Sequence, residues 1–462
     1  MSTAPTTAPA STPASTSYDL IIIGAGPGGY VAAERAGAMG KSVLIVERSF
    51  LGGTCLNVGC IPSKTLLNSS KMYAHAAHGK AFGVETGAVT FNLDTVMKRK
   101  TKIIETLRKG IGFQMKRFKV DVVEGSASFV DRSTVKVGET TYTGKNVMIA
   151  TGSSPIRPPI PGADQPHVVD STGVLNMDKL PKQVVIIGGG VIGMEFASFF
   201  GHIDIPVTVV EMLPEILPTF EPELAKILRK ELPNVTCNTG CKVESIGADS
   251  VTFSRDGKQE SVPADLVLMS IGRSPNVKGL NLEGIGVEFD PRKGIRVDEQ
   301  LRTNIPGVYA VGDVNGRSQL AHSASRMGEV AVNTMFGHAD RMRYGTIPWV
   351  VYTTPEVAGV GMTEAQAKAA GHEVQTATWQ LRNNGRFLAE HDKEAGICKV
   401  VVDAKSHILL GVHMIGGACS EMIYGAATML ETELRTDDIR EIVFPHPTAS
   451  ESLRDAIFEL SH

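Results

Sequence analysis

The stretch Leu20–Gly29, LIIIGAGPGG, decides how the chain folds. Its four consecutive apolar residues predict a buried parallel strand, and the glycines that follow permit a tight turn into a helix. A second apolar strand, Ser42–Val46, comes after this helix and ends at Glu47. The order is typical of a dinucleotide-binding unit, because the helix N-terminus can approach a pyrophosphate and the acid can hydrogen-bond a ribose hydroxyl.

The same pattern occurs a second time at Val184–Gly193, VVIIGGGVIG, followed by a strand at Val207–Val210 and by Glu211. The spacing from the first glycine to the acid is the same in both copies. The alternative is a structural turn followed by a surface glutamate, but this would have to occur twice with the same spacing from glycine to glutamate. We therefore expect two dinucleotide sites. Neither apolar run is expected to span a membrane, because glycines and a glutamate interrupt each one.

A cysteine pair follows the first unit, in the segment Gly52–Lys64, GGTCLNVGCIPSK. Cys55 and Cys60 can form a disulfide if one turn of chain brings their Cα atoms to about 5.5 Å. A structural bridge or two buried thiols are the alternatives, but a bridge closing so short a loop stabilises little. Cytosolic cysteines are usually reduced unless they are catalytic or redox-sensing. The pair therefore indicates a redox centre beside a two-electron cofactor.

The two dinucleotides can be assigned from their surroundings. Only the first unit leads directly into the cysteine pair, so we expect FAD there as the redox mediator. The second unit should bind a diffusible nicotinamide. Glu211 would repel the 2′-phosphate of NADP, and Met212–Pro218 contains no arginine to neutralise one. NAD is therefore favoured.

Length and composition predict about three domains of ordinary size in 462 residues. A net charge of -3 gives no reason to expect nucleic acid or membrane as a partner. Residues 1–17 carry no charged side chain and are expected to form a disordered tail without a targeting signal. Cys237 and Cys241 have zinc-like spacing, but no second pair lies nearby, so no metal site is expected.

Several segments together resemble the flavoprotein disulfide reductases, and within them the branch that oxidises dihydrolipoyl groups. These are the cysteine segment, both glycine turns, Gly307–Val314 (GVYAVGDV) and His446–Glu451 (HPTASE). The resemblance implies an α/β fold with two Rossmann-like dinucleotide-binding domains, for FAD and NAD, plus a C-terminal α+β dimerisation domain. The expected boundaries are the tail at 1–17, the FAD domain at 18–152, the NAD domain at 153–280, a central domain completing the FAD site at 281–345 and the interface domain at 346–462.

The resemblance also assigns roles to individual residues. Cys60 would contact the flavin, and Cys55 would exchange electrons with the substrate. Lys64 would lie near the flavin, and Glu195 near the contact between flavin and nicotinamide. The expected FAD contacts are Gly24, Gly26, Gly29, Glu47, Lys64, Gly125, Thr151, Gly152, Ser153, Asp313, Gln319, Leu320, Ala321 and His322. The expected NAD contacts are Gly188, Gly190, Gly193, Glu195, Glu211, Val243 and Gly272.

A base is required near the cysteine pair, because a thiol substrate reacts as its thiolate. Pro447 restrains the backbone of His446, and Glu451 could orient the imidazole from the start of a helix. The alternative is a capping box, in which Glu451 and Thr448 merely close the helix end. The resemblance favours the catalytic pair and implies that His446 serves the cysteines of a partner subunit.

The predicted activity is oxidation of protein-bound dihydrolipoyl groups to lipoyl with NAD. The expected partners are a second copy of the chain and lipoyl-bearing subunits of 2-oxoacid dehydrogenase complexes or a lipoyl carrier protein, in the cytoplasm. The alternative is another disulfide reductase of the glutathione or mercuric type. A glutathione reductase normally uses NADPH, and a mercuric reductase should end in a cysteine pair, which Phe458–His462 lacks. A subunit that binds FAD passively would not need the cysteines and His446.

Overall fold

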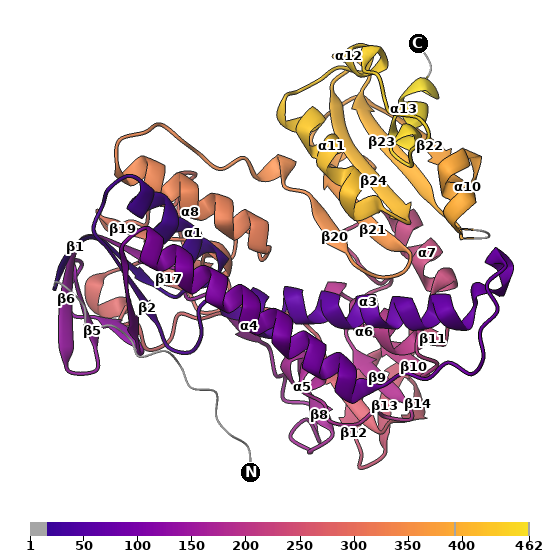
Figure 1. Cartoon of the computed structure of the whole chain (residues 1–462), viewed down its shortest axis with the longest axis horizontal. Coiled ribbons are helices and arrows are strands. Elements are labelled where there is room, and N and C mark those ends of the chain that lie inside the picture. Colours follow the sequence, from indigo (N-terminus) through magenta and orange to yellow (C-terminus); the bar gives the residue numbers. More distant parts are fainter. Residues whose placement is uncertain (1–15, 392–393, 461–462) are drawn as a thin grey trace. The chain divides into compact units, whose positions relative to one another are not determined.

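The computed structural model describes residues 16–391 and 394–460 (Figure 1). Most of the expected tail, residues 1–15, therefore lies outside the described residues, and the first strand already begins at Ser17. The chain forms two compact units, each assembled from three separate stretches of sequence. The first unit comprises the chain up to Pro62, Lys98–Ile156 and Arg273–Met342. The second comprises Ser63–Met97, Arg157–Gly272 and the chain from Arg343 onward.

The first unit is built on a seven-stranded sheet in the order β3-β2-β1-β6-β5-β4, with β19 also paired to β6. The strands β3, β2, β1, β6 and β19 form parallel pairs, and β4 and β5 extend the sheet antiparallel. The bounds are β1 Ser17–Ile23, β2 Val43–Glu47, β3 Val120–Glu124, β4 Ala127–Phe129, β5 Thr134–Val137, β6 Thr140–Ile149 and β19 Val308–Ala310. The two apolar strands expected from the first glycine unit are thus confirmed.

Helices and short ladders complete this unit. The helices α1 (Pro27–Ala38) and α8 (Ala321–Met335) pack against each other (Figure 1). The cysteine segment forms α2 (Gly53–Val58) and the beginning of α3 (Cys60–Ala77). The remaining elements are α4 Leu93–Arg117, which enters the unit at Lys98, β7 Ser153–Pro155 paired with β16 Arg273–Pro275, β17 Phe289–Asp290 paired with β18 Gly294–Ile295, and the 3-10 turns η2 Glu283–Ile285 and η3 Gly312–Asn315.

The second unit contains a parallel sheet in the order β11-β10-β9-β15-β8. Its strands are β8 Val168–Val169, β9 Val184–Ile187, β10 Val207–Val210, β11 Val235–Asn238 and β15 Leu266–Met269. The helices beside it are α5 Ser171–Leu175, α6 Val191–Gly201 and α7 Pro222–Glu231, and an antiparallel ladder is formed by β12 Lys242–Ile246, β13 Ser250–Arg255 and β14 Lys258–Pro263. The strands and the helix predicted for the second glycine unit are confirmed. A buried apolar core that includes Phe199 and Phe200 underlies the sheet.

The C-terminal part of the second unit is an antiparallel sheet in the order β20-β21-β24-β23-β22 with helices packed on it. The strands are β20 Trp349–Val351, β21 Glu356–Gly361, β22 Val374–Gln380, β23 Ile397–Asp403 and β24 Leu409–Gly416. The helices and turns are η4 Tyr344–Thr346, α9 Glu364–Ala369, η5 Leu381–Asn383, α10 Gly385–His391, α11 Cys419–Glu431, α12 Thr436–Glu441 and α13 Glu451–Phe458, and η1 Gly79–Phe82 follows α3 earlier in the chain. This arrangement is the α+β domain that the sequence predicted.

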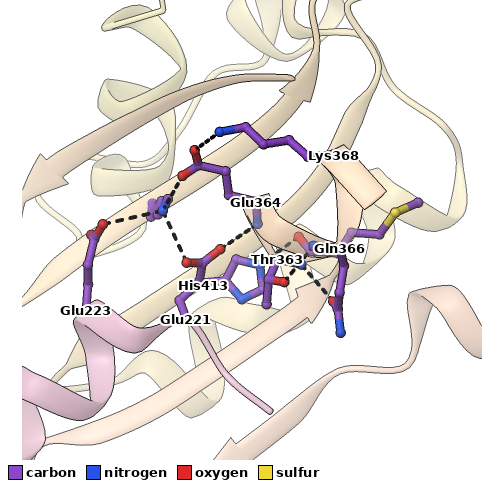
Figure 2. A network of polar contacts seen from close by, with 9 residues as sticks. Glu221, Glu223, Thr363, Glu364, Gln366, Lys368 and His413 are labelled. Carbon is purple, nitrogen blue, oxygen red and sulfur yellow. Dashed lines mark hydrogen bonds and ion pairs between the residues drawn. The ribbon is translucent and has the colours of Figure 1, made fainter. Parts of the chain in front are cut away.

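A buried charge network joins α7 to the antiparallel sheet within the second unit (Figure 2). The ammonium of Lys399, on β23, lies 2.9 Å from a carboxylate oxygen of Glu364 and 3.2 Å from one of Glu221. Glu221 also accepts a hydrogen bond from the backbone N–H of Glu364. Burial disfavours the charge on Lys399, but the carboxylates of Glu364, Glu221 and Glu223 outweigh it and raise the pKa of Lys399.

Replacing Lys399 with methionine should destabilise the second unit by about 3–5 kcal/mol, because Glu221 is buried and would lose its direct cation. The free energy of unfolding can be followed in urea by the fluorescence of Trp349 and Trp379, which both lie in this unit. The matched control is Lys368→Met, which removes a more exposed cation from the same Glu364 carboxylate and should cost at most about 1 kcal/mol. Equal losses for the two variants would contradict a buried-charge role for Lys399.

Candidate functional site

The first glycine turn leaves the N-terminus of α1 open to a ligand. Gly24 has a φ of +106°, and a Cβ at this position would lie 2.4 Å from the carbonyl oxygen of Ala150. A Cβ at Gly29 would lie 2.0 Å from the carbonyl oxygen of Gly24. By contrast, a Cβ at Gly26, the N-cap of α1, would meet nothing nearer than 3.9 Å. The turn is thus closed by packing on its inner side and open at the helix N-terminus, where a pyrophosphate fits.

Glu47 lies at the end of β2, beside this turn. Its carboxylate accepts hydrogen bonds from the backbone N–H groups of Ala25, at 2.8 Å, and Ser49, at 2.9 Å. These two bonds hold the carboxylate next to the glycine turn. The side chain remains partly exposed, and a carboxylate can accept further hydrogen bonds, such as those of a ribose.

Cys55 and Cys60 form a disulfide, as the sequence predicts. Cys55 lies in α2 and Cys60 begins α3, and their Cα atoms are 4.6 Å apart. Gly52, the N-cap of α2, has a φ of +96°, which only glycine adopts at little cost. The cysteine pair therefore bridges the short break between α2 and α3.

The turn that carries the disulfide is fixed by a contact that the sequence analysis missed. The guanidinium of Arg108 donates to the side-chain oxygen of Asn57 at 2.7 and 3.2 Å and lies 3.9 Å from the ring centroid of Phe50. The amide of Asn57 donates to the carbonyl oxygens of Leu51 and Gly53. An asparagine between the two cysteines was the available signal, but nothing in the sequence identifies its distant partner.

A second group of predicted FAD residues meets where β6, β7 and η3 come together in the first unit. The hydroxyl of Ser153 donates to a carboxylate oxygen of Asp313 at 2.5 Å. Arg273, which the sequence analysis did not single out, donates to the hydroxyl of Ser153 at 2.7 Å and to its carbonyl oxygen at 2.6 Å. Thr151 and Asn276 hold the neighbouring backbone through reciprocal hydrogen bonds. The Asp313 carboxylate is therefore held in a fixed orientation.

The other predicted FAD residues of the first unit lie on backbone segments. Gly125 follows β3 and donates its N–H to the carbonyl oxygen of Glu47. Gly152 follows β6 with a φ of +67°. The side-chain amide of Gln319 donates to the carbonyl oxygen of Arg273, and the remaining predicted contacts, Leu320, Ala321 and His322, form the N-cap and first residues of α8.

The second glycine turn repeats the geometry of the first. Gly188 has a φ of +105°, and a Cβ at Gly193 would lie 2.1 Å from the carbonyl oxygen of Gly188. A Cβ at Gly190, the N-cap of α6, would meet nothing within 4 Å. The carboxylate of Glu211 accepts from the backbone N–H groups of Gly189 at 2.6 Å and Leu213 at 2.7 Å. This turn therefore has room for a second pyrophosphate, and the Glu211 carboxylate is held in a fixed orientation beside it.

Lys64 and Glu195 form an ion pair within the second unit, at 2.8 Å. Glu195 is buried on α6 and also accepts from the backbone N–H of Tyr352 at 3.0 Å. The Lys64 ammonium lies 4.6 Å from the ring centroid of Tyr352. The other two predicted NAD residues are Val243, on β12, and Gly272, which follows β15 with a φ of +122°.

His446 and Glu451 form the pair that the sequence predicts. The Nδ1 atom of His446 lies 3.0 and 3.2 Å from the two carboxylate oxygens of Glu451, and 80% of the His446 side chain is exposed. The backbone N–H of Thr448 and the histidine together lower the pKa of Glu451. Only half of the alternative capping box forms: the backbone N–H of Thr448 donates to the Glu451 carboxylate at 2.9 Å, but the hydroxyl of Thr448 donates to the carbonyl oxygen of Pro445, and α13 begins at Glu451 itself.

The loop that carries His446 has one further anchor. The side-chain amide of Asn384, which is buried, donates to the carbonyl oxygen of Thr448 at 2.9 Å. Asn384 was not predicted, since nothing in its local sequence links it to a loop so distant along the chain. Among the other histidines, His413 is fully buried against the carbonyl oxygen of Met362, and His391 lies beside Glu394.

The four remaining cysteines are free thiols. Burial raises the pKa of Cys237 to about 11 and that of Cys398 to about 12, and it also raises the pKa of Cys419 well above the usual value of a thiol. These thiols are therefore poor nucleophiles, in contrast to the cysteine pair. In the part of the chain that the structure describes, no helix has the length and apolar character needed to cross a bilayer.

Comparison with known proteins identifies the family. Residues 18–328 match the model of the pyridine nucleotide-disulphide oxidoreductases, and residues 347–457 match the dimerisation domain of the same family, which supports a homodimer. The chain is 42% identical over 459 residues to dihydrolipoyl dehydrogenase 3 of Pseudomonas putida, covering 95% of this chain and 97% of the relative. It is 39% identical to dihydrolipoyl dehydrogenase of Geobacillus stearothermophilus, covering 95% of each.

One solved structure has a similar fold over nearly the whole chain. The flavoprotein disulfide reductase RclA of Escherichia coli superposes with a TM-score of 0.84 at 29% identity, covering 96% of this chain and 100% of that one. Three features of this chain agree with this likeness: two glycine turns, a disulfide in the segment after the first glycine turn, and a C-terminal dimerisation domain. The chain belongs to the pyridine nucleotide-disulphide oxidoreductase family.

Proposed function

We propose that this chain is a dihydrolipoyl dehydrogenase, which oxidises protein-bound dihydrolipoyl groups to lipoyl groups with NAD as the acceptor. The observation that carries the proposal is the Cys55–Cys60 disulfide on the turn that follows the first dinucleotide unit. The relatives that match nearly the whole chain carry the name of this activity, which supports the same substrate here.

FAD and NAD are the cofactors of the family, and the two glycine turns fit them. The open N-terminus of α1 would receive the FAD pyrophosphate, with Glu47 at the ribose and Asp313 at the ribityl chain. The open N-terminus of α6 would receive the pyrophosphate of NAD, with Glu211 at the ribose. Glu211 is already held by two backbone N–H groups, so it opposes the additional phosphate of NADP. This favours NAD and disfavours an NADPH-dependent glutathione-type reductase.

The chemical step begins with the substrate thiol. His446 would accept a proton from one thiol of the dihydrolipoyl group, and Glu451 would orient the imidazole through its Nδ1 atom. The resulting thiolate would attack Cys55, which breaks the disulfide and releases Cys60 as a thiolate. The second substrate thiol would then displace Cys55, so the lipoyl disulfide forms as the cysteine pair is reduced.

The enzyme must be reoxidised after each turnover. FAD held by the first glycine turn, Glu47 and Asp313 would supply the two-electron chemistry that couples the reduced cysteine pair to NAD. The Cys60 thiolate would lie against the flavin, and the Lys64–Glu195 ion pair would orient the lysine near the ring. The family resemblance assigns the His446 base to the cysteine pair of the partner subunit.

The expected partners are lipoyl-bearing acyltransferase subunits of 2-oxoacid dehydrogenase complexes or a lipoyl carrier protein. We further propose that the protein acts in the cytoplasm. The four cysteines outside the redox pair are free thiols, as is usual in a reducing compartment.

A substrate panel tests the proposal. The purified FAD-loaded protein is assayed with dihydrolipoamide and NAD, with glutathione disulfide and NADPH, and with mercuric ion and NADPH. Turnover with the first pair that exceeds the other two by at least about 100-fold is expected, since a site built for one substrate rejects analogues that lack its contacts. Preference for either NADPH-dependent reaction would refute the proposal.

A further inference from the structure

The helix α4 carries a line of exposed basic side chains. Arg99, Lys102, Lys109 and Lys116 are all exposed and form what we call the α4 stripe. The three lysines are seven residues apart, which places them on one face of a helix. At 1.5 Å per residue, the stripe from Arg99 to Lys116 is about 25 Å long, a length suited to the face of a small protein domain. All four residues belong to the first unit.

The exposed Glu105, three residues after Lys102 and four before Lys109, is the single acidic residue between Arg99 and Lys116, so the stripe keeps an excess of positive charge. Within residues 16–391 and 394–460, Lys102, Lys109 and Lys116 take part in no ion pair. The chain as a whole has a net charge of -3, so a basic surface of this kind is not a consequence of overall composition. A local excess of positive charge attracts an acidic partner and raises the rate of its association.

An exposed aromatic side chain lies within the stripe. Phe113, between Lys109 and Lys116, is 66% exposed. It lies on the same helix face as the lysines, because it follows Lys109 by four residues and precedes Lys116 by three. Aromatic side chains are enriched in the cores of protein interfaces, and polar groups surround them at the rim. The stripe is therefore better suited to binding a folded protein than to attracting small ions.

The same helix is anchored to the redox turn. Arg108, next to Lys109 in sequence, donates both of its hydrogen bonds to Asn57, which lies between Cys55 and Cys60. Arg108 also covers the ring of Phe50, just before the cysteine segment. A partner bound along the stripe would thus be held beside the turn that carries the disulfide, within one unit.

We propose that the α4 stripe docks the acidic face of a lipoyl-bearing carrier domain and so delivers its dihydrolipoyl arm to the cysteine pair. This inference rests on the proposed function, and it adds the surface and the charge that select the carrier. Docking raises the effective concentration of the tethered arm at the disulfide. The free substrate dihydrolipoamide has no protein face and gains nothing from the stripe.

The test compares two triple variants of the FAD-loaded protein. Lys102→Glu/Lys109→Glu/Lys116→Glu reverses the stripe, and Lys258→Glu/Lys278→Glu/Lys293→Glu makes the same change in net charge at exposed lysines elsewhere. Each is assayed with free dihydrolipoamide and with a dihydrolipoylated carrier domain that has an acidic surface. At low ionic strength the stripe variant should lose at least about tenfold in kcat/KM for the carrier, mainly through KM. Its activity with free dihydrolipoamide should not change.

Three controls make the outcome decisive. The loss should vanish at about 0.5 M salt, where exposed charges are screened. With a carrier whose surface carboxylates are converted to amides, the wild type should lose the advantage in kcat/KM that it shows with the unmodified carrier. Phe113→Ser should lower carrier turnover to the same extent at low and high salt. Similar behaviour of the two triple variants toward the carrier would overturn the docking proposal. Binding of duplex DNA by the wild type, abolished in the stripe variant, would overturn it in favour of nucleic acid.

The docking proposal and the proposed function fail in different ways. If the wild type does not oxidise free dihydrolipoamide, the proposed function is wrong whatever the stripe does. If the wild type oxidises both substrates and the stripe variant retains full carrier turnover, only the docking proposal is wrong.

Discussion

Cys60→Ser is expected to reduce turnover of dihydrolipoamide by at least about 10⁴-fold, because the serine oxygen cannot take part in a disulfide that accepts two electrons. FAD should remain bound, since the glycine turn, Glu47 and Asp313 are untouched by the change. Steady-state reduction of NAD measures the loss, and the visible absorbance of the flavin measures the cofactor content.

The companion variant Cys55→Ser separates the roles of the two sulfurs. It should be equally inactive, but its remaining Cys60 thiolate should give a long-wavelength charge-transfer absorption with the flavin, which Cys60→Ser should lack. Cys419→Ser is the matched control, because it removes a buried free thiol with a strongly raised pKa and should retain turnover. Retained activity in either variant of the pair would remove the chemical basis of the proposed function.

The parts of the site that the sequence predicted are those with local determinants. The strands around both glycine turns form as expected because short apolar runs bounded by glycine have few other stable placements. Cys55 and Cys60 are only five positions apart, so the short break between α2 and α3 suffices to pair them. The contact between His446 and Glu451 is also local, and the structure combines it with half of the capping box that the sequence left open, the bond from the Thr448 N–H to Glu451.

The parts that the sequence did not predict depend on contacts between distant segments. Arg273 meets Ser153 across 120 positions of sequence, and Arg108 meets Asn57 across 51. Polar side chains of these types are frequent on any surface, and neither helical nor strand periodicity specifies which two of them meet. The fold brings each pair together, so their function becomes visible only with the structure.

His446→Gln is expected to lower kcat for dihydrolipoamide by about 10²–10⁴-fold at neutral pH, the range typical of a lost general base. The loss should become smaller as the pH rises toward 9, because a larger fraction of the substrate thiol is then already the thiolate. Reduction of ferricyanide by NADH requires no thiol and should be unaffected. The rates of both reactions are measured across the pH range on the same preparation.

Glu451→Gln and His338→Gln complete this test. Glu451→Gln keeps the size of the side chain but removes its charge, which the lowered pKa of Glu451 keeps present throughout the neutral range. It should therefore cause a smaller loss than His446→Gln, with the thiol-independent reaction again intact. His338 is exposed, and its replacement should change neither reaction. If His446→Gln lowered both reactions equally at every pH, the histidine would be supporting the fold and not the proton transfer, because a base is needed only where a thiol must ionise.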